Sequence, residues 1–153
     1  MKKTTKILFA ASSLFFLISC EDTKKETTPE TTTTKETIEE SCFLMAKNRD
    51  TTTVNLKIEN NQVSGSMEWL PYEKDGAHGT LAGTKNPNGE MNLIYTYTIE
   101  GSNQTSEEIM KIENNQLLVK KGELIDPNND GHTKFKDAAT AVYADTLQKV
   151  DCK

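Results

Sequence analysis

Three cysteines have the most definite chemistry in this chain, since a thiol can be acylated, oxidised to a disulfide or used to bind a metal. They occupy positions 20, 42 and 152 of the 153-residue sequence. An odd number of cysteines in an exported protein predicts that one of them does something other than pair within the chain. Their positions separate them, because Cys20 follows an apolar leader whereas Cys42 and Cys152 stand at the two ends of the remaining sequence.

The leader predicts that Cys20 is lipidated. A basic segment with three lysines precedes an apolar segment, residues 7–18, that is too short for an ordinary membrane-spanning helix. The run LISC that ends at Cys20 resembles a lipobox, the motif at which lipoprotein signal peptidase cleaves. We therefore predict a signal peptide over residues 1–19 and a mature chain that begins with an acylated, palmitate-bearing Cys20.

Cys42 and Cys152 are predicted to form a disulfide bond. Compartments outside the cytoplasm are oxidising, so a disulfide persists there. The pair also brackets the whole sequence that follows the leader and its polar extension. The alternative is a pair of free, buried thiols.

An Asp- and Asn-rich run, DPNNDG, could bind calcium. It matches the opening of an EF-hand-like loop, with Asp126, Asn128 and Asp130 at the first three ligand positions and Asp137 at the twelfth. It departs from that pattern because the twelfth residue is not Glu, the eighth is not aliphatic and the flanks read as strands. The alternative is a turn in which these side chains bond their own backbone.

No residue pattern in the sequence predicts an enzyme. The chain has only two histidines and no Gly-x-Ser-x-Gly segment, which argues against zinc or copper sites of the usual kind and against a serine hydrolase. Adjacent carboxylates such as Glu107 and Glu108 are expected on the solvated surface of a chain with net charge −5. Basic patches with interleaved aromatic residues are absent from the sequence, so nucleic acid is not a predicted partner.

The elements that must position these residues are β-strands. Hydrophobic and polar residues alternate with a period of two, as at Val54, Leu56 and Ile58, and clusters of Asn, Asp, Gly and Pro separate the alternating runs. A short helical turn is expected within residues 133–141. The strands are predicted at residues 42–47, 52–59, 62–70, 79–85, 90–100, 104–113, 116–125 and 142–152.

A meander of consecutive antiparallel strands has two exposed edges unless it closes into a barrel. Closure makes the first and last strands neighbours, which would bring Cys42 and Cys152 within disulfide distance. The predicted fold is therefore all-β, an antiparallel meander of about eight strands in a closed or flattened β-barrel.

The sequence divides into three regions: the signal peptide, a tether at residues 20–41 and the barrel domain at residues 42–153. The tether is rich in Thr, Glu and Lys, and Ile38 is its only large apolar residue. Such a composition cannot form a core, so the tether is predicted to be disordered.

The most distinctive motifs lie in the middle of the barrel domain. A WLPYEKDG run at residues 69–76 is followed by G-T-x-x-G at residues 79–83 and by a tyrosine-rich strand that ends at Glu100-Gly101. With the bracketing cysteines, these motifs resemble a family of small uncharacterised lipoproteins of Bacteroidota over most of residues 42–152. The resemblance implies a β-rich fold and a place in the cell envelope, and it implies no activity.

Together these features predict a lipid-anchored cell-envelope protein that is not an enzyme and needs no cofactor other than the calcium considered above. Glu21 and Asp22 resemble acidic sorting signals of surface lipoproteins, which favours the outer membrane, on its periplasmic or surface face. The predicted function is a binding or structural module for an unidentified protein or small molecule. The alternatives are a carrier of a small apolar ligand, because an eight-stranded lipocalin-like barrel can enclose one, or an inhibitor of an envelope-attacking hydrolase.

Overall fold

The computed structural model describes residues 38–153, so the predicted signal peptide, Cys20 and most of the predicted tether lie outside the described residues. Within this range no helix is long and apolar enough to cross a membrane. The strands of the described region are β1 (Ile38–Lys47), β2 (Asp50–Glu59), β3 (Gln62–Leu70), β4 (Ala77–Lys85), β5 (Glu90–Ile99), β6 (Ser102–Glu113), β7 (Gln116–Lys121), β8 (Leu124–Ile125), β9 (His132–Phe135) and β10 (Val142–Val150).

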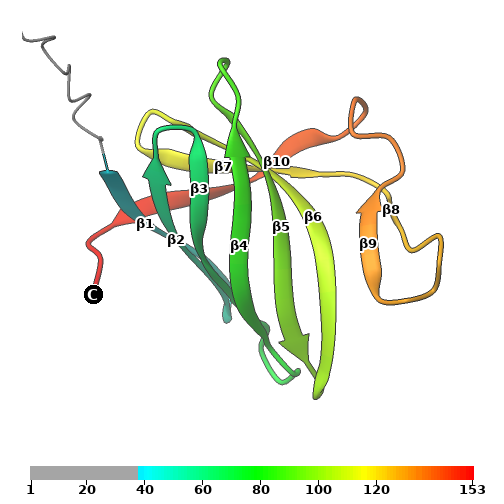
Figure 1. Cartoon of the computed structure of the whole chain (residues 1–153). Coiled ribbons are helices and arrows are strands. Elements are labelled where there is room, and N and C mark those ends of the chain that lie inside the picture. The colour runs from blue at the N-terminus through cyan, green and yellow to red at the C-terminus, as the bar shows by residue number, and fades with distance from the viewer. Residues whose placement is uncertain (1–37) are drawn as a thin grey trace, which may run out of the picture. The chain divides into compact units, whose positions relative to one another are not determined.

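Eight of these strands form a closed ring of antiparallel neighbours (Figure 1). The order around the ring is β5-β4-β3-β2-β1-β10-β7-β6, and β6 pairs in turn with β5. The ring confirms the predicted all-β fold and its closure. The first strand starts earlier than predicted, because Ile38 already pairs with Glu59 of β2.

The backbones of β4 and β5 approach each other closely at two glycines of β4. Gly79 and Gly83 lie on the same face of β4 as the buried Leu81. A Cβ atom at Gly79 would overlap the carbonyl oxygen of Thr96, and one at Gly83 would overlap that of Asn92. Glycine therefore permits a close approach of the two strand backbones that no other residue allows.

Alternate residues of the ring strands point inward and form one hydrophobic core. This alternation is the period-two pattern of the sequence. The buried core residues are Phe43, Val54, Leu56, Ile58, Val63, Leu81, Met91, Leu93, Tyr95, Met110, Leu117, Val119 and Leu147.

A polar cluster on the outer face links three strands of the ring. The Oε2 atom of Glu90 accepts a hydrogen bond of 2.9 Å from the Tyr143 hydroxyl and lies 2.7 Å from Nζ of Lys120. These contacts lower the pKa of Glu90, the Lys120 hydrogen bond most and the Tyr143 hydrogen bond next. The cluster thus holds β5 to β7 and β10.

The segment between β7 and β10 differs from the prediction. The expected strand at residues 116–125 is interrupted after Lys121, and the segment 133–141 begins with a strand, β9, that runs parallel to β6. The rest of this segment contains a turn in which the amide of Thr140 donates to the carbonyl oxygen of Asp137, at 3.2 Å.

The excursion formed by β8 and β9 continues the sheet beside β6 and also covers part of the outer face of β6. Phe135 of β9 and Ala141 form a small buried cluster with Ile109, which lies on the outer face of β6. The amide of Phe135 also donates a 3.1 Å hydrogen bond to Oε2 of Glu107. A strand residue on the outer face is therefore buried by a covering segment, which explains why Ile109 interrupts the alternating pattern.

The turns that connect the ring strands lie alternately at its two ends. The turns β1–β2, β3–β4 and β5–β6 lie at one end, which we call the mouth, and which is the lower end in Figure 1. The turns β2–β3, β4–β5 and β6–β7 lie at the opposite end. Because β1 runs towards the mouth, the chain reaches the domain at Ile38 on the opposite end.

Candidate functional site

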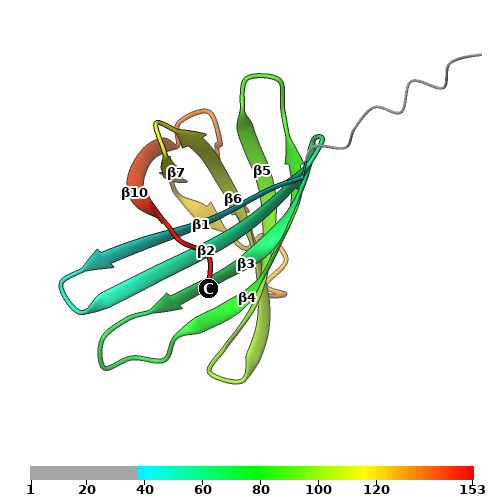
Figure 2. The same ribbon diagram turned by 90° about the vertical axis from the view of Figure 1, so that its left-hand side faces the viewer.

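The disulfide predicted from the cysteine positions is present. The sulfur atoms of Cys42 and Cys152 are 2.07 Å apart and their Cα atoms 5.2 Å apart. The bond lies beside the pairing of β1 with β10, which extends only from Cys42 opposite Val150 to Leu44 opposite Gln148. Figure 2 shows the C-terminal residues leaving β10 and crossing β1 towards β2. The disulfide therefore reinforces a short junction at which the ring closes.

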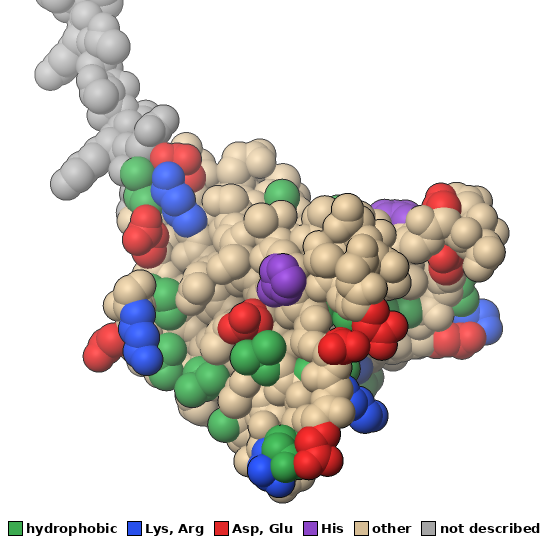
Figure 3. Space-filling model, turned by 90° about the horizontal axis from the view of Figure 1, so that it is seen from below, with side chains coloured by type: hydrophobic (Ala, Val, Ile, Leu, Met, Phe, Trp, Pro, Cys, Tyr) green, Lys and Arg blue, Asp and Glu red, His purple; other side chains and the backbone are tan. Residues whose placement is uncertain are grey.

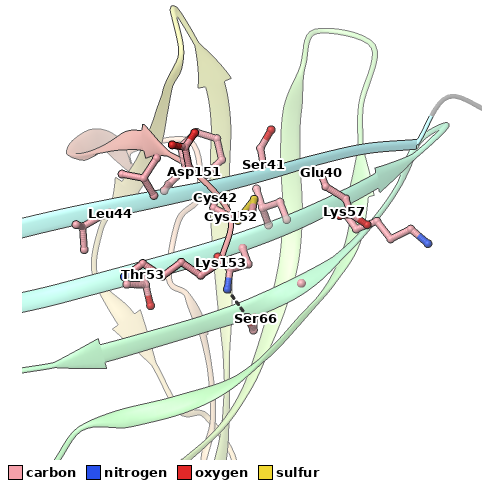
Figure 4. Close-up of a pocket in the computed structure, with 15 residues that line it drawn as sticks. Glu40, Ser41, Cys42, Leu44, Thr53, Lys57, Ser66, Asp151, Cys152 and Lys153 are labelled. Atoms are coloured by element: carbon pink, nitrogen blue, oxygen red, sulfur yellow. Dashed lines mark hydrogen bonds between the residues drawn. A yellow bond between two sulfur atoms is a disulfide. The ribbon is translucent and has the colours of Figure 1, made fainter.

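A groove of about 650 Å³ lies beside this disulfide (Figure 4). Its walls come from β1, β2, β3 and the C-terminal residues 150–153. Nδ2 of Asn55 donates a 3.3 Å hydrogen bond to Oγ of Ser66, both on the exposed face. The groove is thus an open feature of the outer surface, formed where the C-terminus crosses the sheet.

A second cavity lies inside the ring and has a volume of about 390 Å³. Pockets for small ligands have volumes of roughly 300–1,000 Å³, so the size is sufficient for one. All ten strands contribute to its wall. The lining residues are Met45, Thr52, Val54, Met67, Trp69, Ala77, Tyr95, Tyr97, Ile99, Ser106, Glu108, Val119, Lys121, Leu124, Thr133, Asp145 and Leu147.

The cavity extends from the core to the mouth. Its inner wall contains Val54 and Leu147, which are buried, whereas Trp69 at the end of β3 is 41% exposed. Figure 3 views the molecule from the mouth end and shows hydrophobic side chains exposed among acidic and polar ones. The wall of the cavity therefore includes residues near the mouth as well as residues of the core.

Two tyrosines form an aromatic wall within the cavity. The rings of Tyr95 and Tyr97 stack with centroids 4.6 Å apart. The Tyr95 hydroxyl donates to the carbonyl oxygen of Met67 at 3.0 Å, and the Tyr97 hydroxyl to Oε1 of Gln104 at 2.9 Å. Burial, with smaller effects from Tyr97 and Glu108, raises the pKa of Tyr95 to about 12. Both side chains are consequently neutral and fixed in orientation.

Glu108 places a carboxyl group in this mostly apolar wall. Burial raises its pKa above the ordinary value of 4.5, the positive charge of Lys121 opposes that rise, and the negative charge of Asp145 adds to it. Lys121 and Asp145 form an ion pair of their own, with Nζ 3.4 Å from Oδ2. The prediction that Glu108 belongs to the solvated surface is therefore wrong.

The neighbouring Glu107 points to the other face of β6, where it bonds the amide of Phe135. Successive strand residues face opposite sides, so adjacent carboxylates cannot act together. The sequence indicates which carboxylate faces inward, because Glu108 lies two and four residues before Met110 and Ile112 and so points to the same face of the strand. The hydrophobicity of those two residues marks that face as the inner one.

The predicted calcium residues lie in the loop between β8 and β9 and in the turn after β9. The carboxylate of Asp126 accepts hydrogen bonds from the amides of Asp130 and Gly131, at 3.2 and 2.9 Å. The bond from Gly131 is the largest cause of a lowered pKa at Asp126. Asn128 donates to Asp130 Oδ2 at 3.4 Å, while Oδ1 of Asp130 accepts from His132 at 3.0 Å.

Asp137 is engaged separately, because its Oδ1 accepts a 2.9 Å hydrogen bond from the amide of Ala139. Among residues 38–153, no group of three or more His, Cys, Asp or Glu side chains is placed to hold a metal ion. The loop geometry is that of the self-bonded turn considered as the alternative, and calcium binding stays a prediction.

Comparison with protein-family models, with curated proteins and with solved structures gave no match to this chain. The fold and the interior cavity are therefore the basis for a functional proposal, and the resemblance to Bacteroidota lipoproteins stays a prediction.

Proposed function

We propose that this chain is a lipid-anchored cell-envelope protein whose barrel binds a small, largely apolar ligand and catalyses no reaction. The observation that carries the proposal is the cavity of about 390 Å³ inside the closed ring, which all ten strands line. Among the alternatives derived from the sequence, the ligand carrier is the one that this cavity favours. The proposed anchor is the acylated Cys20, at the outer membrane.

The composition of the wall supports an apolar ligand. Met45, Met67 and Ile99 contribute flexible or aliphatic surface, and Trp69 and the tyrosine pair contribute aromatic surface. Burying apolar ligand surface against such a wall stabilises the complex by about 25 cal/mol for each Å² removed from water. Methionine side chains adapt to irregular ligand shapes, which suits a binding cavity more than a rigid core.

The position of the mouth supports a carrier that is tethered to a membrane. The chain joins the domain at Ile38, at the end of the ring opposite the mouth. In the proposed carrier, the mouth is the end at which a ligand is exchanged, and Ile38 lies at the other end.

The proposal is tested with an uncharged fluorescent apolar probe, N-phenyl-1-naphthylamine, and a matched pair of alanine variants. Ala77→Leu adds volume inside the cavity, because Ala77 lines it and is only 4% exposed. Ala82→Leu adds the same atoms to the exposed outer face of the same strand. We expect saturable, one-site binding to the wild type and to Ala82→Leu, and at least tenfold weaker binding to Ala77→Leu.

Wild-type protein that gives no saturable signal, or an Ala77→Leu variant that binds as tightly as the wild type, would rule out the interior as the ligand site. Native mass spectrometry of protein purified from envelopes is expected to show a mass increment equal to one small ligand.

A further inference from the structure

We infer that the ligand of the cavity is an organic cation, an amine with an apolar body whose nitrogen lies beside the carboxylate of Glu108. This inference rests on the proposed function and adds the chemical class of the ligand. It follows from three properties of the cavity: an unpartnered carboxylate, a negative charge balance and an aromatic wall.

Glu108 lines the cavity, and no side chain of residues 38–153 forms a hydrogen bond or an ion pair with its carboxylate. Burial is the main cause of its raised pKa, and the charges of Lys121 and Asp145 act on it in opposite directions. In the described region every fully buried polar side-chain atom has a partner. The oxygens of Glu108 are therefore not sealed in the core, and the residue belongs to the wall of the cavity. A carboxylate that faces an apolar cavity without a partner is stabilised by a ligand that supplies an N–H donor and a positive charge.

The tyrosine and lysine side chains of the lining have partners of their own. The hydroxyl groups of Tyr95 and Tyr97 already donate elsewhere, at 3.0 and 2.9 Å. Lys121 is the single basic residue of the lining, and its ammonium group is 3.4 Å from Asp145. The charges of Lys121 and Asp145 offset each other, so Glu108 leaves the wall with one net negative charge when it is ionised.

The aromatic wall favours the same ligand. The stacked rings of Tyr95 and Tyr97 belong to the same cavity lining as Glu108, and the charge of Glu108 contributes to the raised pKa of both phenols. The faces of aromatic rings attract cations within about 6 Å of the ring centre. A protonated amine can therefore contact the carboxylate and the rings together, whereas a fatty-acid carboxylate would be repelled by Glu108.

The inference is tested by three probes that share one apolar chain, decylamine, decanol and decanoate. The protein used begins at Glu21, directly after the proposed lipidation site at Cys20, and it retains every described residue. Trp69 is the only tryptophan of the sequence and lines the cavity, so its fluorescence reports occupancy. Decylamine is protonated at pH 7.5, since alkyl ammonium groups have pKa values near 10.4.

We expect decylamine to bind at least tenfold more tightly than decanol, and decanoate to bind most weakly. In Glu108→Gln the advantage of decylamine over decanol is expected to fall to less than twofold. Glu107→Gln is the matched control, because it removes the neighbouring charge on the outer face of the same strand and leaves the advantage unchanged.

Each outcome separates the inference from the proposed function. Equal affinities of decylamine and decanol, or an advantage that survives Glu108→Gln, would overturn the inference while the apolar carrier stands. Wild-type protein that binds none of the three probes would overturn both.

Discussion

Removal of the Cys42–Cys152 disulfide is expected to cost a large fraction of the stability of the barrel. The bond closes a loop with a sequence separation of 110 residues. A loop of that length lowers the entropy of the unfolded chain by an amount worth about 5 kcal/mol at 25 °C. Native domains are stable by only about 5–15 kcal/mol, so the loss is a large fraction of the total.

The structure adds a local reason for a large effect. β1 and β10 pair through only three residue positions, from Cys42 opposite Val150 to Leu44 opposite Gln148, and the disulfide lies beside them. Without the covalent link, this short junction is expected to open before the longer pairings, such as that of β1 with β2 from Ile38 to Lys47.

The assay is urea unfolding of the Cys42→Ala/Cys152→Ala variant against the oxidised wild type, followed by circular dichroism. With a urea dependence of about 1–3 kcal/mol per M, a loss of about 5 kcal/mol lowers the midpoint by roughly 2 M or more. Reduced wild-type protein is the control for packing, because it keeps both thiol side chains. If the variant and the reduced protein both unfold within about 1 kcal/mol of the oxidised protein, the loop-entropy reasoning is refuted.

Four further predictions concern single sites. Cys20→Ser is expected to abolish palmitate labelling at the N-terminus, and labelling that persists contradicts the lipobox. Glu108→Gln is expected to stabilise the barrel by about 1 kcal/mol at pH 7; because folding raises the pKa of Glu108, native stability falls as pH rises from 4.5 through that raised pKa. The gain should therefore vanish below about pH 4 in melts across pH, and a gain independent of pH would refute this reasoning. Tyr143→Phe should lower the free energy of unfolding by about 0.5–1 kcal/mol at pH 7, because it removes the hydrogen bond to Glu90. This loss should shrink as pH falls through the lowered pKa of Glu90, and urea titrations at two pH values measure it. Thermal melts in millimolar calcium and in chelator should coincide, because the Asp126 carboxylate already serves backbone amides, whereas a higher Tm in calcium would establish the metal site.

Much of the fold could be predicted from sequence because alternation and turn chemistry are local properties. The predicted β2–β3 boundary, for instance, follows from Asn60-Asn61, and Asn60 has the positive φ of 59° that this residue type tolerates. The same reasoning places the β6–β7 turn, where Asn114 and Asn115 have φ values of 52° and 61°. Ring closure followed from combining these strands with the positions of the two cysteines.

The excursion between β7 and β10 could not be predicted in this way. β8 has two residues and β9 four, so neither is long enough to show a period. Their pairing depends on contacts with β6, including Thr105 opposite His132, that are distant in sequence. The burial of Ile109 is likewise decided by Phe135, which sequence alternation cannot reveal.

The interior site was missed for a related reason. The prediction treated Glu107 and Glu108 as one pair of surface carboxylates, although strand geometry sends them to opposite faces. The phase of Met110 and Ile112 could have assigned Glu108 to the inside. The volume left around it depends on how side chains from all ten strands fit together, which no local pattern encodes.

The order of strands around the ring has a consequence for how the protein matures. The first strand of the ring finds its second neighbour only in the last strand, so the ring cannot close until the final residues of the chain are available. Contacts of such long sequence separation make folding slow compared with that of a helical domain of equal size. While the chain folds, the edge of β1 that faces away from β2 therefore stays unpaired until Val142–Val150 is available, and an unpaired strand edge is where folding intermediates associate with other chains.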